Sequence, residues 1–255
     1  MKRYTRLLLA TCLSLASLLP IKAATPYQEA FEKGNEAYAD GQYALAIEQY
    51  VAALQSGFES WEVFFNLGNA YYRSGNYPQA ILYYERAALR TRTKTPIQTN
   101  LALAESKIAD RFEQMPRFFA TAWWNKLTEA FSPTAWAIIL LGLFFLILAS
   151  SCLYLLGRNY LQKKTGFFGF VFCLLLLTVG SLAAVNDYRQ AKKEYAIVMC
   201  LSVEAKTSPE ERSQTKFMLH EGSKVLIEDR IGTYGKIRIK NGSRAWIPME
   251  CLEKI

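Results

Sequence analysis

The sequence repeats one pattern of residues at a fixed offset. Residues 34–53 read GNEAYADGQYALAIEQYVAA, and residues 68–87 read GNAYYRSGNYPQAILYYERA. Every matched pair lies 34 positions apart: Gly34/Gly68, Asn35/Asn69, Tyr38/Tyr72, Gly41/Gly75, Tyr43/Tyr77, Ala46/Ala80, Ile47/Ile81, Tyr50/Tyr84 and Ala53/Ala87. A constant offset of this kind indicates stacked structural units, each of which buries its apolar surface against its neighbours.

Each unit reads as two helices joined by a tight turn. Gly41 and Gly75 interrupt the helical pattern, and the residues after them are apolar at i, i+1, i+4 and i+7, which marks one helical face. Gly34 and Gly68 lie inside the first helices, where glycine costs about 1 kcal/mol relative to alanine. We therefore expect close helix contact there, with Ala46 facing Gly34 in the first unit.

This 34-residue helical hairpin resembles the tetratricopeptide repeat. The second unit carries residues at its signature positions: Phe64, Leu67, Gly68, Tyr71, Ala80, Tyr84 and Ala87. Two repeats bury little surface, so a further helix should follow them. Thr95-Pro96 is a helix start, and apolar residues follow it at helical spacing: Ile97, Leu101, Ala104, Ile108 and Phe112. The resemblance implies an all-α repeat domain over residues 24–115, with two repeats and a capping helix.

Residues 1–23 have the pattern of a secretory signal peptide. Lys2, Arg3 and Arg6 precede an apolar run, which ends before Pro20 and small residues. The net charge of +8 therefore belongs in large part to a cleaved segment. The remaining basic excess flanks the apolar middle of the chain, and we predict no nucleic-acid partner.

The middle of the chain predicts two transmembrane helices. Residues 135–157 and 167–185 contain no Asp, Glu, Lys, Arg or His, and the first segment is long enough to cross a hydrocarbon layer of about 30 Å. Residues 158–166 form the expected cytoplasmic loop, and residues 186–194 form a linker. Because ion pathways need ionisable groups in the membrane, the two spans are expected to be anchors in the lipid bilayer.

Residues 116–134 have an aromatic stripe ahead of the first span. Phe119, Trp123, Leu127 and Phe131 recur every four residues. One interpretation is an amphipathic helix that lies at the membrane interface. The other is a helix that packs as the missing last helix of the repeat domain.

Residues 195–255 change from helical period to alternation. Apolar residues alternate with polar ones around Ile227 and Ile237, and Asn241-Gly242 marks a turn. The layout resembles a bacterial SH3-like domain, which implies an all-β barrel. Trp246 is interpreted as a core residue, with a ligand platform as the alternative. Cys200 and Cys251 fall on strands that are neighbours in SH3-like folds, so the resemblance leaves a disulfide between them open.

Residue patterns typical of catalysis are missing from the sequence. His220 is the only histidine, and Lys224 stands where an HExxH zinc motif needs its second histidine. Phosphate-binding and nucleophile motifs are also lacking, so we predict a non-enzymatic chain without cofactor or metal. His220 is interpreted as a turn residue.

The order of these segments resembles the BatE-type proteins of the Bat (Bacteroides aerotolerance) operon. Residues between the modules carry the resemblance, notably Pro116-Arg117-Phe118-Phe119, Leu219-His220-Glu221-Gly222 and Trp246-Ile247-Pro248. It implies a bacterial inner-membrane protein. The predicted signal peptide exports the residues that follow it, and two spans return the chain to the same side, so we expect periplasmic N- and C-terminal domains. The implied partners are von Willebrand A-type Bat proteins and, indirectly, a MoxR-like ATPase, and the implied role is aerotolerance or envelope stress.

The tetratricopeptide resemblance also implies where a protein partner binds. Ligands of such repeats lie along the first helix of each unit, and by register the groove residues are Phe31, Asn35, Tyr38, Phe65, Asn69, Tyr72 and Arg73. The asparagines are expected to bond the backbone of an extended peptide. The alternative is that these are ordinary repeat residues without a partner.

Three functions are compatible with these patterns to different degrees. The leading hypothesis is a scaffold that binds partner proteins through the repeats. The second is an envelope protein that binds peptidoglycan through residues 195–255. A transporter or enzyme subunit is the third, and it lacks both charged groups in the spans and a catalytic constellation.

Overall fold

The computed structural model describes residues 26–91, 95–110, 123–124, 128 and 131–255. Contacts divide the chain into two units. The first unit extends to Asp110 and includes the turn His220–Ser223, and the second holds most of the remaining chain. The predicted signal peptide lies outside the described residues, as does most of the aromatic segment 116–134.

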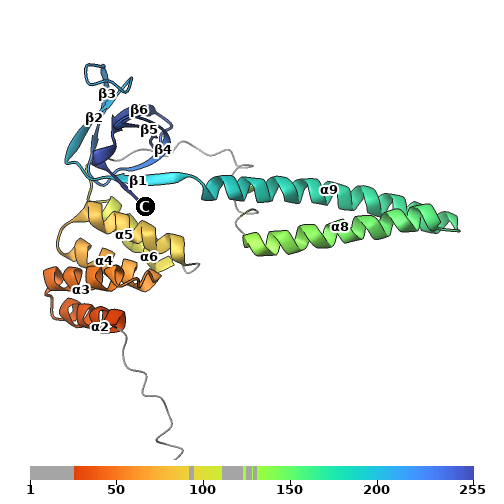
Figure 1. Cartoon of the computed structure of the whole chain (residues 1–255), viewed down its shortest axis with the longest axis horizontal. Coiled ribbons are helices and arrows are strands. Elements are labelled where there is room, and N and C mark those ends of the chain that lie inside the picture. The colour runs from red at the N-terminus through yellow and green to blue at the C-terminus, as the bar shows by residue number, and fades with distance from the viewer. Residues whose placement is uncertain (1–25, 92–94, 111–122, 125–127, 129–130) are drawn as a thin grey trace, which may run out of the picture. The chain divides into compact units, whose positions relative to one another are not determined.

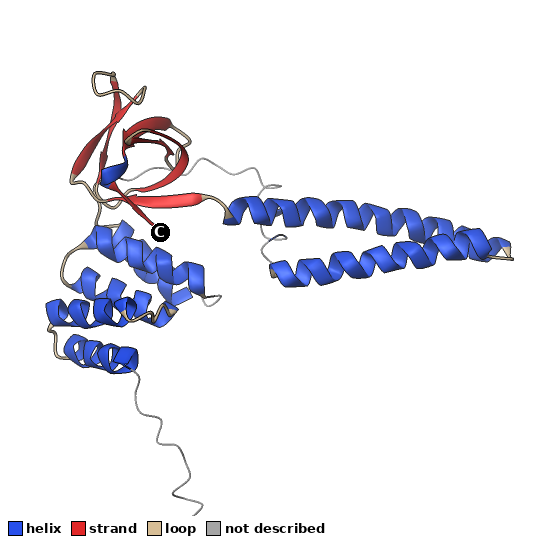
Figure 2. Ribbon diagram, viewed as in Figure 1, coloured by secondary structure: helices blue, strands red, loops and turns tan. Residues whose placement is uncertain are grey.

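The first unit is a stack of helices (Figures 1 and 2). Its elements are α2 (Pro26–Ala39), α3 (Tyr43–Gln55), α4 (Trp61–Arg73), α5 (Tyr77–Arg90) and α6 (Thr95–Glu105). Gly41 and Gly75 have φ of 75° and 85°, a backbone conformation that glycine adopts without steric cost, and they end the first helix of each repeat. The tetratricopeptide-like repeats predicted from the 34-residue period are confirmed.

Large aromatic residues fill the space inside each repeat. The Tyr50 and Tyr84 side chains are almost fully buried, and their rings cross Gly34 and Gly68. The atoms nearest to an added Cβ at Gly34 belong to Tyr50 rather than to Ala46, so the small residue accommodates a ring and not another small residue. Helix α6 occupies the position of the first helix of a third repeat. It ends at Glu105, whereas the apolar spacing predicted a helix that continues through Ile108 and Phe112.

Two long apolar helices follow, α8 (Pro133–Leu156) and α9 (Tyr160–Ala191). Both are long and apolar enough to cross a membrane, and the apolar windows are 0% and 11% buried, unlike the core helix of a soluble protein. The second helix is longer than the predicted span at both ends, so residues 160–166 of the expected loop and residues 186–191 of the expected linker are helical. Gly180 packs against Leu140 and Trp136 of α8, as small residues do between membrane helices.

The C-terminal region is an antiparallel sheet. Its strands are β1 (Glu194–Val198), β2 (Ser202–Lys206), β3 (Thr215–His220), β4 (Lys224–Ile231), β5 (Tyr234–Arg238), β6 (Arg244–Pro248) and β7 (Leu252–Lys254), with a short 3₁₀ helix at Met249–Cys251. The strands pair in the order β3-β2-β6-β5-β4-β1-β7. The closed barrel that we predicted is therefore wrong: β3 and β7 are the two edges of an open sheet. Alternation along a strand identifies a buried face but not whether the end strands meet.

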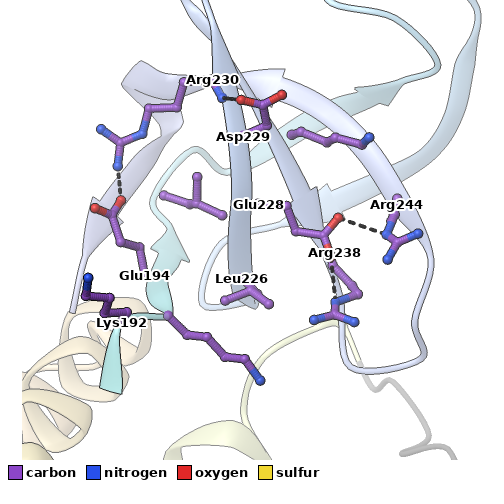
Figure 3. Close-up of a pocket in the computed structure, with 11 residues that line it drawn as sticks. Lys192, Glu194, Leu226, Glu228, Asp229, Arg230, Arg238 and Arg244 are labelled. Atoms are coloured by element: carbon purple, nitrogen blue, oxygen red, sulfur yellow. Dashed lines mark hydrogen bonds and ion pairs between the residues drawn. The ribbon is translucent and has the colours of Figure 1, made fainter. Parts of the chain in front are cut away.

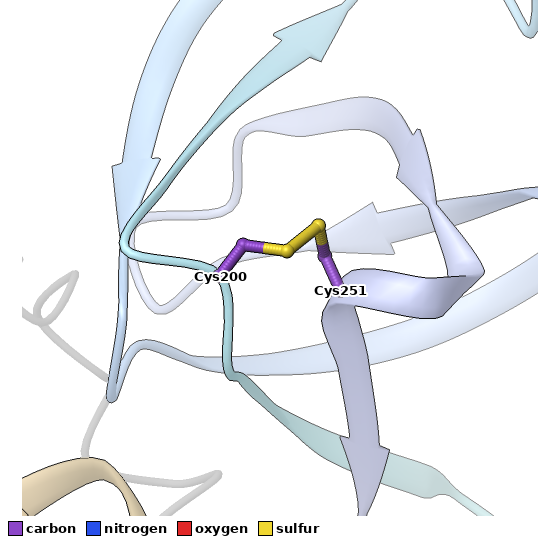
Figure 4. The surroundings of a disulfide bond; sticks show 2 residues. All are labelled: Cys200 and Cys251. Carbon is purple, nitrogen blue, oxygen red and sulfur yellow. A yellow bond between two sulfur atoms is a disulfide. The ribbon is translucent and has the colours of Figure 1, made fainter.

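One face of the sheet carries the apolar core, which includes Val225, Ile237 and Ile247. Trp246 is buried, but it alternates with the core residues Ala245 and Ile247 and therefore points to the opposite face. A disulfide joins Cys200 to Cys251, with their Cα atoms 5.1 Å apart (Figure 4). It ties the loop after β1 to the end of the 3₁₀ helix.

Candidate functional site

Pairs of asparagines connect the first helices of successive repeats. Asn66 of α4 donates from Nδ2 to the Oδ1 of Asn35 on α2 at 3.0 Å. The same bond recurs 34 residues later, where Asn100 of α6 donates to Asn69 of α4 at 2.8 Å. The line of asparagines therefore runs along the three first helices, and α6 takes part as the start of a third unit.

A buried tyrosine completes each asparagine pair. The hydroxyl of Tyr50 donates to Asn35 Oδ1, and that of Tyr84 donates to Asn69 Oδ1, each at 2.8 Å. Burial raises the pKa of Tyr50 to about 12, and it raises the pKa of Tyr84 even further above its usual range. Both hydroxyls are therefore protonated at neutral pH and remain donors.

These bonds change the role expected for Asn35 and Asn69. Each side-chain oxygen already accepts two hydrogen bonds from within the repeats. The Nδ2 groups of Asn35 and Asn69 and the Oδ1 atoms of Asn66 and Asn100 have no bonded partner among the described residues. Each asparagine pair therefore retains an amide donor group and a carbonyl acceptor, the two kinds of group that an extended peptide backbone can satisfy.

The other predicted aromatic groove residues lie on the same helices as Asn35 and Asn69, and they contact tyrosines of α3 and α5. Phe31 packs against Tyr50 at 5.9 Å between ring centroids, and Phe65 packs against Tyr84 at 5.8 Å. The ring of Tyr38 makes an edge contact with Tyr43, and the ring of Tyr72 makes the same contact with Tyr77, 34 residues later. These residues are half-buried, so part of each ring remains open to a ligand.

Arg73 is exposed at the end of α4. Its guanidinium lies 4.9 Å from the centre of the Tyr43 ring, which belongs to the preceding repeat. Such a contact places a positive charge beside the aromatic residues without neutralising it. The structure thus brings the predicted residues Tyr38 and Arg73 to the same tyrosine.

A second polar cluster in the first unit centres on Asp110. Its carboxylate accepts hydrogen bonds from the backbone N–H of His220 at 2.7 Å and from the hydroxyl of Ser223 at 2.6 Å, and it pairs with Nδ1 of His220 at 2.8 Å. Burial raises the pKa of the carboxyl, but the bonds from Ser223 and His220 together lower it more, so the net pKa is below its usual value. His220 is thus the last residue of β3, at the start of the turn that leads to Ser223, and both its backbone N–H and its ring bond to Asp110.

Metal-binding groups are not assembled in the part of the chain that the structure describes. No group of three or more His, Cys, Asp or Glu side chains with ligand geometry occurs among those residues.

The sequence prediction missed Asn66 and Asn100 as members of the site. The signal was the recurrence of Asn66-Leu67 as Asn100-Leu101, because it continues the 34-residue period into α6. Their pairing with Asn35 and Asn69, at a separation of 31 residues, depends on how one helix stacks against the next. Asp110 gave no sequence signal.

Comparison with known proteins supports the repeat assignment. Residues 31–95 match a family described as Tetratricopeptide repeat. No curated protein matches the chain. Tetratricopeptide repeats are in general modules for protein interaction and not for catalysis.

Proposed function

We propose that this chain is a non-enzymatic, membrane-anchored scaffold that binds an extended segment of a partner protein along α2, α4 and α6. The observation that carries the proposal is the pair of asparagine–asparagine bonds, which fix the four amides and leave an amide donor group and a carbonyl acceptor of each pair for a ligand. The half-buried aromatic rings beside them supply apolar contact. A peptide in this position would replace hydrogen bonds to water with hydrogen bonds between its backbone and the asparagine pairs, at two sites one repeat apart.

The finer identity follows from the resemblance to BatE-type proteins. In this proposal α8 and α9 cross the inner membrane, and the repeats and residues 195–255, with their SH3-like layout, face the periplasm. The partner segments come from von Willebrand A-type Bat proteins, which connect the chain to a MoxR-like ATPase in aerotolerance or envelope stress. Reporter fusions test the topology: a phosphatase that is active when fused at residue 255 supports it, and an inactive one contradicts it.

Asn69→Asp tests the binding face without dismantling the repeats. A carboxylate at this position still accepts from Tyr84 and Asn100, but it lacks the Nδ2 donor. Photo-crosslinking from position 72 in native membranes, followed by mass spectrometry, identifies the partner. We expect the crosslink yield of Asn69→Asp to fall about tenfold, because a partner carbonyl loses its donor and meets a negative charge.

Asn76→Asp is the matched control, since it adds the same charge. Asn76 is exposed at the start of α5, where its side chain accepts from the Gln79 backbone N–H at 3.2 Å, and aspartate caps helices equally well. This variant should retain the wild-type yield. If Asn69→Asp also retains it, the first-helix face is not the binding site.

A second candidate function, binding of peptidoglycan through residues 195–255, is favoured by one feature. A groove of about 580 Å³ lies beside Tyr234, Pro248 and Met249, and it is also lined by the carboxylates Glu204, Glu211 and Glu250. Lys206 also lines the groove, and a tyrosine with three carboxylates beside it suits a glycan or an amine-bearing peptide. Retention of the full chain on isolated peptidoglycan, and its loss in Tyr234→Ala, would support this role; equal retention of both would exclude the groove.

A further inference from the structure

Two arginines face each other across strands β5 and β6. In the antiparallel pairing Arg238 lies directly opposite Arg244. Like charges directly opposite each other destabilise a sheet, so a stable pair of arginines needs a nearby negative charge. The compensating group is Glu228 of β4, whose two oxygens accept from Arg238 Nε at 3.0 Å and from Arg244 Nε at 2.8 Å (Figure 3).

A β-bulge directs Glu228 toward the two arginines. The pairing of β4 with β5 shifts register between Ile227 and Asp229, so Glu228 is the extra residue. A bulge bends the strand and re-aims the side chain of the inserted residue. One carboxylate therefore holds two guanidiniums in fixed orientations and leaves one positive charge uncompensated.

The outward part of each guanidinium remains available. A guanidinium has five N–H donors, and Glu228 takes the one on Nε of each arginine. Neither guanidinium has another bonded partner among the described residues. The Arg238 and Arg244 side chains are 37% and 56% exposed, whereas that of Glu228 is 21% exposed, so the positive groups are the outer ones.

The arginine pair belongs to a groove of about 870 Å³ on this face of the sheet. Basic side chains outnumber acidic ones along it: its polar lining consists of Lys192, Lys193, Arg230, Lys236, Arg238 and Arg244, with Glu194, Glu228 and Asp229. Arg230 pairs with Glu194, and Lys236 lies over the Trp246 ring. The groove therefore attracts an anion, and paired guanidiniums suit the oxygens of a phosphate.

We propose that this groove binds the headgroup phosphate of an anionic phospholipid. Lys192 and Lys193 are the first residues after α9, a helix long and apolar enough to cross a membrane, and they line the same groove as the arginines. Basic residues next to the end of a span attract anionic lipids electrostatically. The inference rests on α9 spanning the bilayer and is independent of what the repeats bind.

Native mass spectrometry of the full chain in a neutral detergent tests the proposal. The probes are phosphatidylglycerol, which is anionic, and phosphatidylcholine of the same chain length, which has no net charge. We expect the wild-type protein to retain phosphatidylglycerol preferentially. In Arg238→Gln/Arg244→Gln that preference should fall about tenfold, because both phosphate-binding forks are gone.

Three controls separate a built site from general attraction. Arg212→Gln/Lys240→Gln removes the same charge elsewhere in the C-terminal region and should keep the preference; a matching loss would overturn the proposal. Arg238→Lys/Arg244→Lys keeps the charge without the fork, and wild-type retention in this variant would overturn it too. Inorganic phosphate at millimolar concentration should not displace the lipid, and full displacement would assign the groove to a soluble anion.

Discussion

The ring of Tyr84 lies across Gly68, so that a Cβ added to this glycine would meet ring carbon Cδ1 at 2.7 Å. The arrangement recurs at Gly34, where the ring of Tyr50 approaches to 2.6 Å. Each tyrosine then reaches the asparagine that follows the glycine and donates its hydroxyl to that side chain. Packing inside a repeat and bonding between repeats thus depend on one residue.

Gly68→Ala should destabilise the repeats although alanine is the better helix former. The gain of about 1 kcal/mol in helix propensity is outweighed by overpacking against the ring, which costs about 1–3 kcal/mol. Thermal unfolding followed by circular dichroism measures the net loss. In a double-mutant cycle with Tyr84→Leu, the cost of Gly68→Ala should shrink. An equal cost in both backgrounds would contradict ring contact as the cause.

Tyr84→Phe should lower the free energy of unfolding by about 1 kcal/mol. The variant keeps the ring but deletes the donor to Asn69 Oδ1, and this hydrogen bond is partly buried. Tyr77→Phe is the matched control, because its ring contacts Tyr72 and its hydroxyl has no bonded partner among the described residues. Urea unfolding should separate the two variants, and identical midpoints would refute the bond's contribution.

Reduction of the Cys200–Cys251 disulfide should destabilise the C-terminal sheet. The bond closes a loop with a sequence separation of 51, for which chain entropy predicts a stabilisation of about 4 kcal/mol. Hydrogen exchange in β1 and β7 with and without reductant measures the change. In a Cys12→Ser/Cys152→Ser/Cys173→Ser background, alkylation without reduction should label no thiol. Two labelled thiols would show that the bond does not form.

Asp110→Asn should remove a stabilising contribution that depends on pH. The folded-state pKa of Asp110 is lowered from an ordinary value of 3.8, so its contribution is fully present above that value and is lost as pH falls through the lowered folded value. The stability difference between wild type and Asp110→Asn should therefore be large at pH 7 and shrink in acid. Asp40→Asn, which removes an exposed carboxylate in the turn before Gly41, is the matched control for the change of charge. Equal stability differences for Asp110→Asn at pH 7 and in acid would contradict the prediction.

The repeat architecture was predictable because its information is local and periodic. The 34-residue offset, the turn glycines and the apolar spacing specify which residues share a helix face, and the stack follows from burying those faces. The two long apolar helices were also predictable, because their central segments contain no charged residue. The ends of α9 were not predictable, because polar residues continue the helix beyond its apolar part.

The roles of individual polar residues were not predictable in the same way. Asn35 and Asn69 were expected to bond the backbone of an extended peptide, and the sequence did not indicate that their oxygens accept hydrogen bonds from residues 15 and 31 positions away. Trp246 was interpreted as core because strand aromatics usually pack, and it is buried, but it lies on the sheet face opposite Ala245 and Ile247. Which residue forms a hydrogen bond with a polar side chain depends on the distances between elements. A local sequence pattern does not specify these distances.

The amino-acid sequence by itself determined a helical repeat, two apolar helices and a β-rich C-terminal region, since each has its own period of hydrophobic residues. Only the tertiary structure decided that the sheet stays open, that the asparagines join successive repeats, and that a bulged glutamate gathers Arg238 and Arg244. Periodicity defines faces within one element. Strand order, stacking distance and the aim of a bulge arise from contacts between elements far apart in the chain.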